Sequence, residues 1–404
     1  MRHPSRPRGI LMAALTATAA IVVGTAGALA TTSPASAADV RDHTLTGYWQ
    51  NFDNGADVLK LADVPDAYGI VAVAFADAVP STPGAISFTL DPAVTSALGG
   101  YDTAAFKADI ATLHSQGRQV VLSVGGQNGV ITLPDQAAAD AFASSSLALM
   151  DEYGFDGVDI DLENAPNLQN MTSALRQISA AKGDSFVLTM APETIYVQPG
   201  GSYLALIDEV SNIITVVNTQ YYNSGSMLGR DGKAYSAGTV DFQTALADIL
   251  LDGHLRADQV GLGLPATSQA AGSGYVSPSV VNNALDCLAA GVNCGSYIPA
   301  AKYPTIRGAM TWSVNWDSTG GYAFANTVGG HLGSLGQGGS TDPGTDPGTD
   351  PEPVDCGATA AWAAGTVYVG GDQAAYDGGL WQAKWWTQGE TPGSADVWQR
   401  VGDC

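Results

Sequence analysis

The sequence has few cations, few histidines and few cysteines. Its 404 residues include 16 Lys and Arg against 39 Asp and Glu, which gives a formal net charge of −23. Such a surface repels phosphate groups, so we expect neither nucleic acid nor anionic lipid as a partner, and a neutral polymer fits better. The five histidines show no H-x-H or H-E-x-x-H spacing and no pairing with cysteine. We therefore expect no metal site and no cofactor.

Long apolar runs are absent beyond the N-terminus. Arg2, Arg6 and Arg8 precede an apolar, small-residue run over about residues 10–30, and an A-x-A site follows at Ala35 to Ala37. This pattern is typical of a signal peptide, so we expect residues 1–37 to be removed and the mature protein to be secreted, extracellular and soluble. The alternative is an uncleaved membrane anchor, because the run is near the roughly 20 residues that span a bilayer.

The four cysteines fall into two local pairs. An oxidising compartment favours disulfides, and of the three possible connectivities we expect Cys287 with Cys294 and Cys356 with Cys404.

A low-complexity segment divides the chain. Residues 336–355 contain GQGGS and a TDPG repeat, whose prolines exclude helix and which has no large apolar residue to form a core. We interpret it as an extended Pro/Gly/Thr/Asp linker. It separates a large domain, residues 42–335, from a mini-domain, residues 356–404.

The large domain alternates short apolar runs with helical patterns. The eight runs are Leu45 to Trp49, Ile70 to Ala76, Gln119 to Gly126, Phe155 to Glu163, Phe186 to Glu193, Ile214 to Asn223, Gln259 to Ala266 and Gly308 to Asp317. Ala-rich stretches with helical spacing lie between several of them. Eight strands alternating with helices predict an α/β fold, a (β/α)8 TIM barrel. A doubly wound open sheet is the alternative, and no G-x-G-x-x-G turn supports it.

The fourth run, FDGVDIDLE, carries the chemistry. Side chains alternate along a strand, so Asp159, Asp161 and Glu163 share one face, and in a barrel strand that face is the interior. Crowded carboxylates in a low dielectric hold at least one proton at neutral pH. Glu163 ends the strand, where barrel enzymes place their chemistry, and a raised pKa suits it to be a general acid. Asp156 would face the opposite side of such a strand. We expect either a local departure from the strand geometry there or a packing role for this residue.

This run resembles the D-x-x-D-x-D-x-E signature of glycoside hydrolase family 18. Five further segments resemble that family's strand motifs in the same order: GYW at Gly47 to Trp49, SVGG at Ser123 to Gly126, MAPE at Met190 to Glu193, QYYN at Gln220 to Asn223 and TWSVNWD at Thr311 to Asp317. Together the six motifs cover most of residues 42–335.

The resemblance implies a substrate-assisted, retaining hydrolysis of β-1,4-linked N-acetylglucosamine. Glu163 is implied as the acid, Asp161 as the partner of the sugar's acetamido group, Asp159 as the residue that shares a proton with Asp161, and Tyr222 as the donor to the acetamido oxygen. Trp312 is implied as the apolar floor under the sugar. The remaining expected pocket-lining residues are Tyr48, Phe75, Gly126, Met190, Gln220 and Asn223.

Two departures from the family pattern bear on function. Asn223 stands where many members have Asp, so a charge next to the site is absent. Between Gln259 and Gly308 there is room for one helix and loops but not for the α+β insertion that walls the cleft of some members. We infer an open cleft and an endo-acting enzyme that attacks within chains.

The mini-domain is rich in aromatic residues. Its pattern, with K-W-W-T-x-G as the most specific part, resembles carbohydrate-binding modules of families 5 and 12, small antiparallel β domains that bind chitin. We expect Trp381, Trp385 and Trp386 to contact chitin. One of the adjacent pair Trp385 and Trp386 should be core and the other exposed, because neighbours on a strand face opposite ways.

The leading interpretation is therefore a secreted endo-chitinase, acting as a monomer on chitin and N-acetylglucosamine oligomers. One alternative is an endo-β-N-acetylglucosaminidase acting on N-glycans, which a chitin-binding module argues against. Another is a non-catalytic chitin-binding protein; such members usually lose the final acid of the signature, and here Glu163 is present.

Overall fold

The computed structural model describes residues 40–163, 165–335, 359–368, 372–383, 387–393 and 397–403. The chain divides into two compact units, residues 1–339 and 340–404. Several predictions lie outside the described residues: the signal peptide 1–37, the linker 336–355, the pair Cys356 and Cys404, and the side chains of Trp385 and Trp386.

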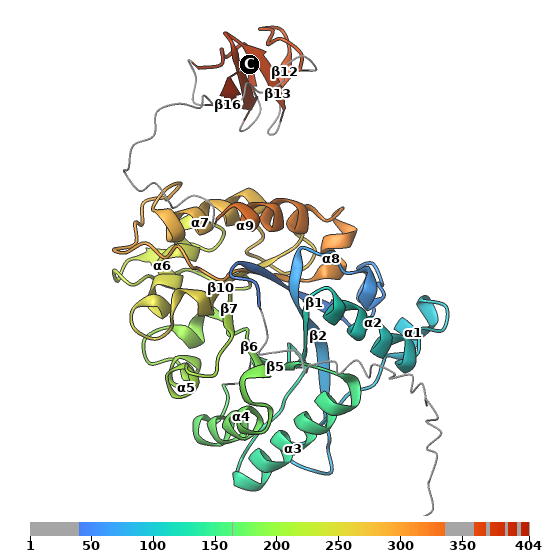
Figure 1. Ribbon diagram of the computed structural model, residues 1–404. Helices are drawn as coiled ribbons and strands as arrows, with labels where there is room; N and C mark the ends of the chain where they lie inside the picture. Colours follow the sequence, from blue (N-terminus) through green and yellow to red (C-terminus); the bar gives the residue numbers. More distant parts are fainter. Residues whose placement is uncertain are drawn as a thin grey trace, which may run out of the picture. The chain divides into compact units, whose positions relative to one another are not determined.

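The first unit is a closed barrel of eight parallel strands (Figure 1). The strands are β1 (Thr44–Gln50), β2 (Tyr68–Ala78), β4 (Gln119–Gly125), β5 (Gly157–Asp161), β6 (Val187–Met190), β7 (Val216–Gln220), β10 (Val260–Pro265) and β11 (Gly308–Trp312). Neighbouring strands pair in chain order, and β1 pairs with both β2 and β11, which closes the sheet. The predicted (β/α)8 barrel is confirmed, and the open doubly wound sheet is excluded.

Helices surround the strands on the outside (Figure 1). They are α1 (Pro92–Ala97), α2 (Thr103–Ser115), α3 (Gln136–Tyr153), α4 (Leu168–Lys182), α5 (Ser202–Val210), α6 (Val240–Leu251), α7 (Pro278–Ala290), α8 (Val314–Thr319) and α9 (Gly330–Leu335). Short 3-10 helices at Leu61–Asp63, Gly183–Ser185, Thr194–Val197 and Ala257–Gln259, and a π-helix at Ala325–Gly329, connect them.

Side-chain caps fix where the longer helices begin. Asp102, Asp135, Asn167 and Thr239 each precede a helix and accept a hydrogen bond from a backbone N–H of its first turn. These bonds satisfy amides that have no partner inside the helix. The helix α3 ends at Gly154, which has a φ of 89°, a conformation that glycine adopts without a steric penalty.

Two apolar layers lie on opposite faces of the strands. A small inner cluster fills the barrel: Tyr48, Ile70, Ala72, Ala74, Val121, Val187, Ala191, Val216 and Met310. The larger outer cluster lies between strands and helices and contains the alternate strand residues. This alternation leaves the inward positions at the C-terminal strand ends for polar groups.

In the helix α6 every residue from Phe242 to Leu251 is buried, because both the β8–β9 region and the chain between α7 and β11 pack on it. In that segment, the backbone amides of Ser296 and Tyr297 donate to Asp241, and the hydroxyls of Tyr297 and Tyr303 donate to the fully buried Asp248. The disulfide Cys287–Cys294 fastens this segment to α7, as predicted from the sequence. The whole stretch from β10 to β11 contains α7 and loops, without a further strand.

Three short strands extend the first unit. β3 (Ile86–Ser87) pairs with the end of β2, and β8 (Met227–Leu228) pairs with β9 (Ala234–Tyr235) after β7. Across the described ranges, none of the helices has the length and apolar character that crossing a membrane needs.

The second unit is small and antiparallel. Its strands are β12 (Val367–Tyr368), β13 (Gln373–Tyr376), β14 (Gly379–Ala383), β15 (Thr387–Gln388) and β16 (Trp398–Asp403). They form the sheets β13-β14-β16 and β12-β15, which agrees with the predicted all-β module. Trp398 is 4% exposed and belongs to its core, against which Trp362 and Trp381 pack while partly exposed.

Candidate active site

The strand β5 brings Asp159 and Asp161 into the barrel interior, where they are 1% and 4% exposed. Glu163 lies two residues beyond the strand and is half-buried. Asp156 precedes the strand at the other end of the barrel. Its carboxylate accepts from the amide of Val120 at 2.7 Å and lies 2.9 Å from the ring of His114, so it fastens β5 to β4 and α2.

Asp159 is held by hydroxyl groups from three other strands. Tyr48 on β1 and Ser123 on β4 donate to Oδ2 at 2.6 and 2.7 Å, and Thr189 on β6 donates to Oδ1 at 2.5 Å. Burial raises the pKa of Asp159, while these three hydrogen bonds act in the opposite direction by stabilising the carboxylate. In the barrel interior, hydrogen bonds from these three hydroxyls therefore take the place of water around the Asp159 carboxylate.

Asp161 has fewer donors and more negative neighbours. Its Oδ1 accepts from Nε2 of Gln220, which also donates to the carbonyl of Ala191. Burial, and then the charges of Asp159 and Glu163, raise the pKa of Asp161 well above its usual range. Of the two buried carboxyls, Asp161 is therefore the one whose surroundings favour the protonated form more strongly.

Glu163 lies beside a second glutamate on the next strand. Ile160 of β5 is in register with Met190 of β6, and continuing this register places Glu163 beside Glu193. Burial, and then the charge of Glu193, raise the pKa of Glu163, and burial raises the pKa of Glu193. A half-buried carboxyl with a raised pKa can both give a proton and take one back near neutral pH.

Tyr222 lies two residues after Gln220, the last residue of β7, and is 7% exposed. Burial, and then the charges of Asp161 and Glu163, raise its pKa well above the usual range, so its hydroxyl keeps its proton. The next residue, Asn223, is exposed, and its backbone amide and side-chain carbonyl exchange hydrogen bonds with the backbone of Ser273. A Cβ on Gly274 would lie 2.5 Å from the Cα of Tyr222, so this loop packs directly behind the tyrosine.

Four aromatic rings form a cluster beside the carboxylates. Trp312 lies 5.4 Å from Tyr48 edge-on and 5.7 Å from Phe75 in a stacked arrangement, with distances measured between ring centroids. Phe52, which the sequence analysis did not select, lies 6.3 Å from both Phe75 and Trp312. Gly126 makes room for this cluster, because a Cβ there would lie 2.6 Å from the ring of Phe75. Phe52, Phe75 and Trp312 are partly exposed, as an apolar platform for a sugar face requires.

The position of Met190 differs from the pocket-lining one predicted for it. Met190 is fully buried in the outer layer between strands and helices. Its neighbour Thr189 faces the interior instead and contacts Asp159. Alternation along the short strand β6 allows only one of the two to face inward.

The arrangement can be compared with known proteins. Residues 44–329 match the family Glycosyl hydrolases family 18. The chain belongs to glycosyl hydrolase family 18. It is 39% identical over 352 residues to Exochitinase 1 of Streptomyces olivaceoviridis. The match covers 75% of this chain and 59% of that protein. It is also 39% identical over 313 residues to Chitinase Chi52 of Paenibacillus xylanexedens, covering 68% of this chain and 58% of that protein. This chain therefore spans less than two thirds of the length of these relatives.

A relative of known structure shares the barrel. The crystal structure of a candidate Chitinase A from Streptomyces coelicolor is 56% identical, with a TM-score of 0.70, and covers 72% of this chain and 99% of that chain. In the second unit, residues 361–399 match Carbohydrate-binding module family 5/12. There the indole N–H of Trp381 donates to the carbonyl of Tyr376 at 3.0 Å, which fixes a partly exposed ring.

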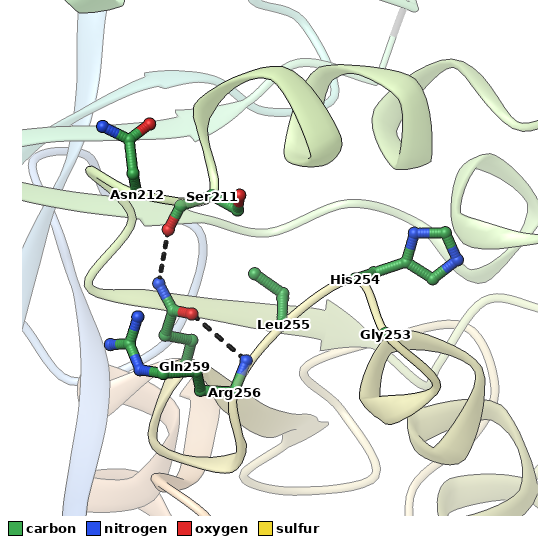
Figure 2. Close-up of a pocket in the computed structure, with 7 residues that line it drawn as sticks. All are labelled: Ser211, Asn212, Gly253, His254, Leu255, Arg256 and Gln259. Atoms are coloured by element: carbon green, nitrogen blue, oxygen red, sulfur yellow. Dashed lines mark hydrogen bonds between the residues drawn. The ribbon is translucent and has the colours of Figure 1, made fainter.

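The family 18 barrel also has a hollow of about 400 Å³ that is lined by loops following α5 and α6. Figure 2 shows the amide of Gln259 bonded to Ser211 and Arg256 there. The ring of His254 lies 2.6 Å from Asp208, and Arg256 pairs with Asp258. The hollow is formed by the loops that precede β7 and β10, so it lies at the strand ends opposite Glu163. In the part of the chain that the structure describes, no group of three or more metal-ligating side chains could hold an ion.

Sequence reasoning missed several residues that contact the carboxylate strand. Ser123 and Thr189 are polar residues inside apolar strand runs, and that signal could have selected them. Glu193 closes the quoted MAPE segment at a strand end. Tyr196 and Tyr203 also contact the strand's backbone, and nothing in the local sequence distinguishes them.

Proposed function

We propose that the protein is a secreted chitinase that hydrolyses β-1,4 linkages between N-acetylglucosamine units of chitin, with retention at the anomeric carbon. It acts as a monomer within chains of the polymer, and the second unit holds it on chitin. The observation that carries the proposal is the half-buried Glu163 with its raised pKa, next to the buried pair Asp159 and Asp161 and the protonated hydroxyl of Tyr222.

The first step transfers a proton from Glu163 to the glycosidic oxygen. As the bond from that oxygen to the anomeric carbon breaks, the carbonyl oxygen of the substrate's own 2-acetamido group attacks the same carbon and forms an oxazolinium ring. Tyr222 donates its hydroxyl to the acetamido oxygen and orients it. Trp312 supports the apolar face of the distorted sugar.

The second step adds water. Glu163, now a carboxylate, takes a proton from the water as it attacks the anomeric carbon, and the oxazolinium ring opens to the acetamido group. Two inversions at one carbon give net retention. Asp161 accepts the acetamido N–H and passes its own proton to Asp159, so that a negative charge lies near the positive ring while it exists.

The chemistry of Asp161 supports substrate assistance over a covalent enzyme intermediate. A nucleophilic carboxylate must be ionised in the free site, whereas burial, and then the charge of Asp159, disfavour the ionised form of Asp161. The acetamido group of the substrate supplies the missing nucleophile. A substrate without that group should not be cleaved.

An open site favours attack within chains. The stretch from β10 to β11 has only α7 and loops, so it adds no further folded domain beside the strand ends that carry Glu163. We expect colloidal chitin to give oligomers of mixed length at the earliest times. A predominantly dimeric early product would contradict this part of the proposal.

The test compares the full chain with Glu163→Gln on colloidal chitin and on soluble N-acetylglucosamine oligomers. Loss of the acid should lower turnover by roughly three orders of magnitude or more, while sedimentation with chitin stays unchanged because the second unit is intact. Glu209→Gln, an exposed change on α5, is the matched control. A parent protein that binds chitin but releases no oligomers would refute the catalytic proposal.

A further inference from the structure

Two tyrosines outside the proposed catalytic set hold the backbone that carries Asp161 and Glu163. Tyr203, on α5, is fully buried. Its hydroxyl accepts from the backbone amide of Leu162 at 2.8 Å and lies 3.0 Å from the carbonyl of the same residue. Tyr196, in the 3-10 helix Thr194–Val197, donates its hydroxyl to the carbonyl of Glu163 at 3.2 Å.

These contacts begin where the sheet stops. The last ladder bonds of this region run from the amide of Ala191 to the carbonyl of Ile160 and from the amide of Gly126 to the carbonyl of Asp161, at 3.0 and 2.8 Å. Beyond them, among the residues that the structure describes, the peptide groups of Leu162 and Glu163 have no strand partner. Buried backbone groups need a partner, and the tyrosine hydroxyls provide it.

The backbone is also confined from the opposite side. A Cβ on Gly125 would lie 2.1 Å from the carbonyl oxygen of Asp161, so the β4 strand end approaches as closely as glycine permits. The end of β4 and the Tyr203 hydroxyl on α5 therefore both restrict the peptide between the two carboxylates. Loss of the Tyr203 hydroxyl leaves the amide of Leu162 unpaired and frees that peptide to shift.

We propose that Tyr203, assisted by Tyr196, is a positioning residue that sets the orientation of Asp161 and Glu163 through the backbone of Leu162. Tyr203 belongs to the outer helical layer and does not touch the sugar. It acts mainly on the chemical step, because a shift of the Leu162 peptide displaces Glu163 and misaligns proton transfer, whereas the backbone of Asp161 stays bonded to the amide of Gly126 and keeps its contact with the substrate. This inference rests on the proposed function and names a residue that the reaction depends on.

The test is Tyr203→Phe in the full chain, which keeps the ring and removes only the hydroxyl. The matched control is Tyr153→Phe on α3, which is also buried and whose hydroxyl donates to the carbonyl of Phe88 at 3.0 Å, away from β5. Tyr203→Phe loses the hydroxyl's contacts with both the amide and the carbonyl of Leu162, whereas Tyr153→Phe loses one contact with a carbonyl, so both variants should lose thermal stability and Tyr203→Phe the more of the two. Only Tyr203→Phe should lower kcat on soluble oligomers, by about 10- to 100-fold, with KM within about twofold of the parent.

The outcomes separate the two proposals. An active parent with an inactive Glu163→Gln establishes the proposed function; a Tyr203→Phe variant with the kcat of the Tyr153→Phe control then overturns the positioning role. A rise in the KM of Tyr203→Phe as large as its loss of kcat would also overturn the positioning role, because it indicates a distorted binding site. If circular dichroism shows that Tyr203→Phe does not fold, Tyr196→Phe replaces it, because Tyr196 is only half-buried. This variant should lose less kcat than expected for Tyr203→Phe. An unchanged kcat would overturn the inference.

Discussion

The three hydroxyls around Asp159 stabilise its ionised form, so removing one of them should lower the stability of the barrel. Thr189→Val keeps the shape of the side chain and removes the donor to Oδ1 of Asp159, an oxygen with no other hydrogen bond among the described residues. A hydrogen bond to a charged group contributes about 1.5–3 kcal/mol. The methyl group that replaces the hydroxyl returns about 0.8 kcal/mol of apolar burial. The barrel should therefore lose about 1–2 kcal/mol of its free energy of unfolding.

The loss should depend on pH, and differential scanning calorimetry of the barrel transition measures it. At about 2–4 °C per kcal/mol for a domain of this size, Tm should fall by roughly 2–8 °C at neutral pH. The hydroxyl stabilises the carboxylate form, so removing it raises the pKa of Asp159 further. The loss is then full where Asp159 is ionised and becomes smaller as the pH falls and Asp159 takes up a proton.

Thr311→Val is the matched control for this measurement. Thr311 is also a fully buried barrel residue, but its hydroxyl donates to the neutral carbonyl of Leu264 at 2.9 Å. Its loss should be smaller, about 1 kcal/mol or less, and independent of pH. If Thr189→Val is as stable as the parent, or loses the same stability at acidic and neutral pH, then Asp159 is not an ionised acceptor held by this hydroxyl.

Two further predictions concern charge and covalent linkage. Glu193→Gln removes a negative charge beside Glu163 and should lower the pKa of Glu163, so the alkaline limb of the pH profile of kcat/KM should move to lower pH; a limb at the parent's position, measured against Glu209→Gln, would show that the two carboxyls do not interact. Replacing Cys287 and Cys294 together by Ser opens a short loop and should lower the free energy of unfolding by about 2–3 kcal/mol. Calorimetry checks this, and an unchanged transition temperature would mean that the hydrogen bonds to Asp241 and Asp248 hold the segment without the disulfide.

The barrel and its carboxylate strand could be predicted because both leave a local signal. Apolar runs mark the strands, and three acids at alternating positions within one run mark the interior face. The assignment failed where the signal is weakest. In the four-residue strand β6, the choice between Thr189 and Met190 depends on parity, and a polar residue flanked by apolar ones was the clue to the correct one.

Contacts between layers could not be predicted from the sequence. Tyr203 lies on a helix whose apolar face packs on the barrel, and its sequence position resembles that of any core tyrosine. Only the three-dimensional fold brings its hydroxyl to the amide of Leu162, 41 residues away in the chain. The burial of α6 from Phe242 to Leu251 has the same origin, because part of its cover, near Tyr297 and Tyr303, follows α7, a different element.

Two groups of carboxyls in this barrel make its stability depend on pH in opposite directions. Asp161, Glu163 and Glu193 have pKa values that folding raises, so each contributes stability that is full below its unfolded pKa and lost as the pH rises through the folded one. Asp241 behaves in the opposite way: burial acts to raise its pKa, but hydrogen bonds from Ser296 and Tyr297 lower it overall. Its contribution is present above its unfolded pKa and is lost as the pH falls. Near neutral pH the proposed catalytic end therefore lowers the stability of the barrel, and contacts of the segment that crosses α6 raise it.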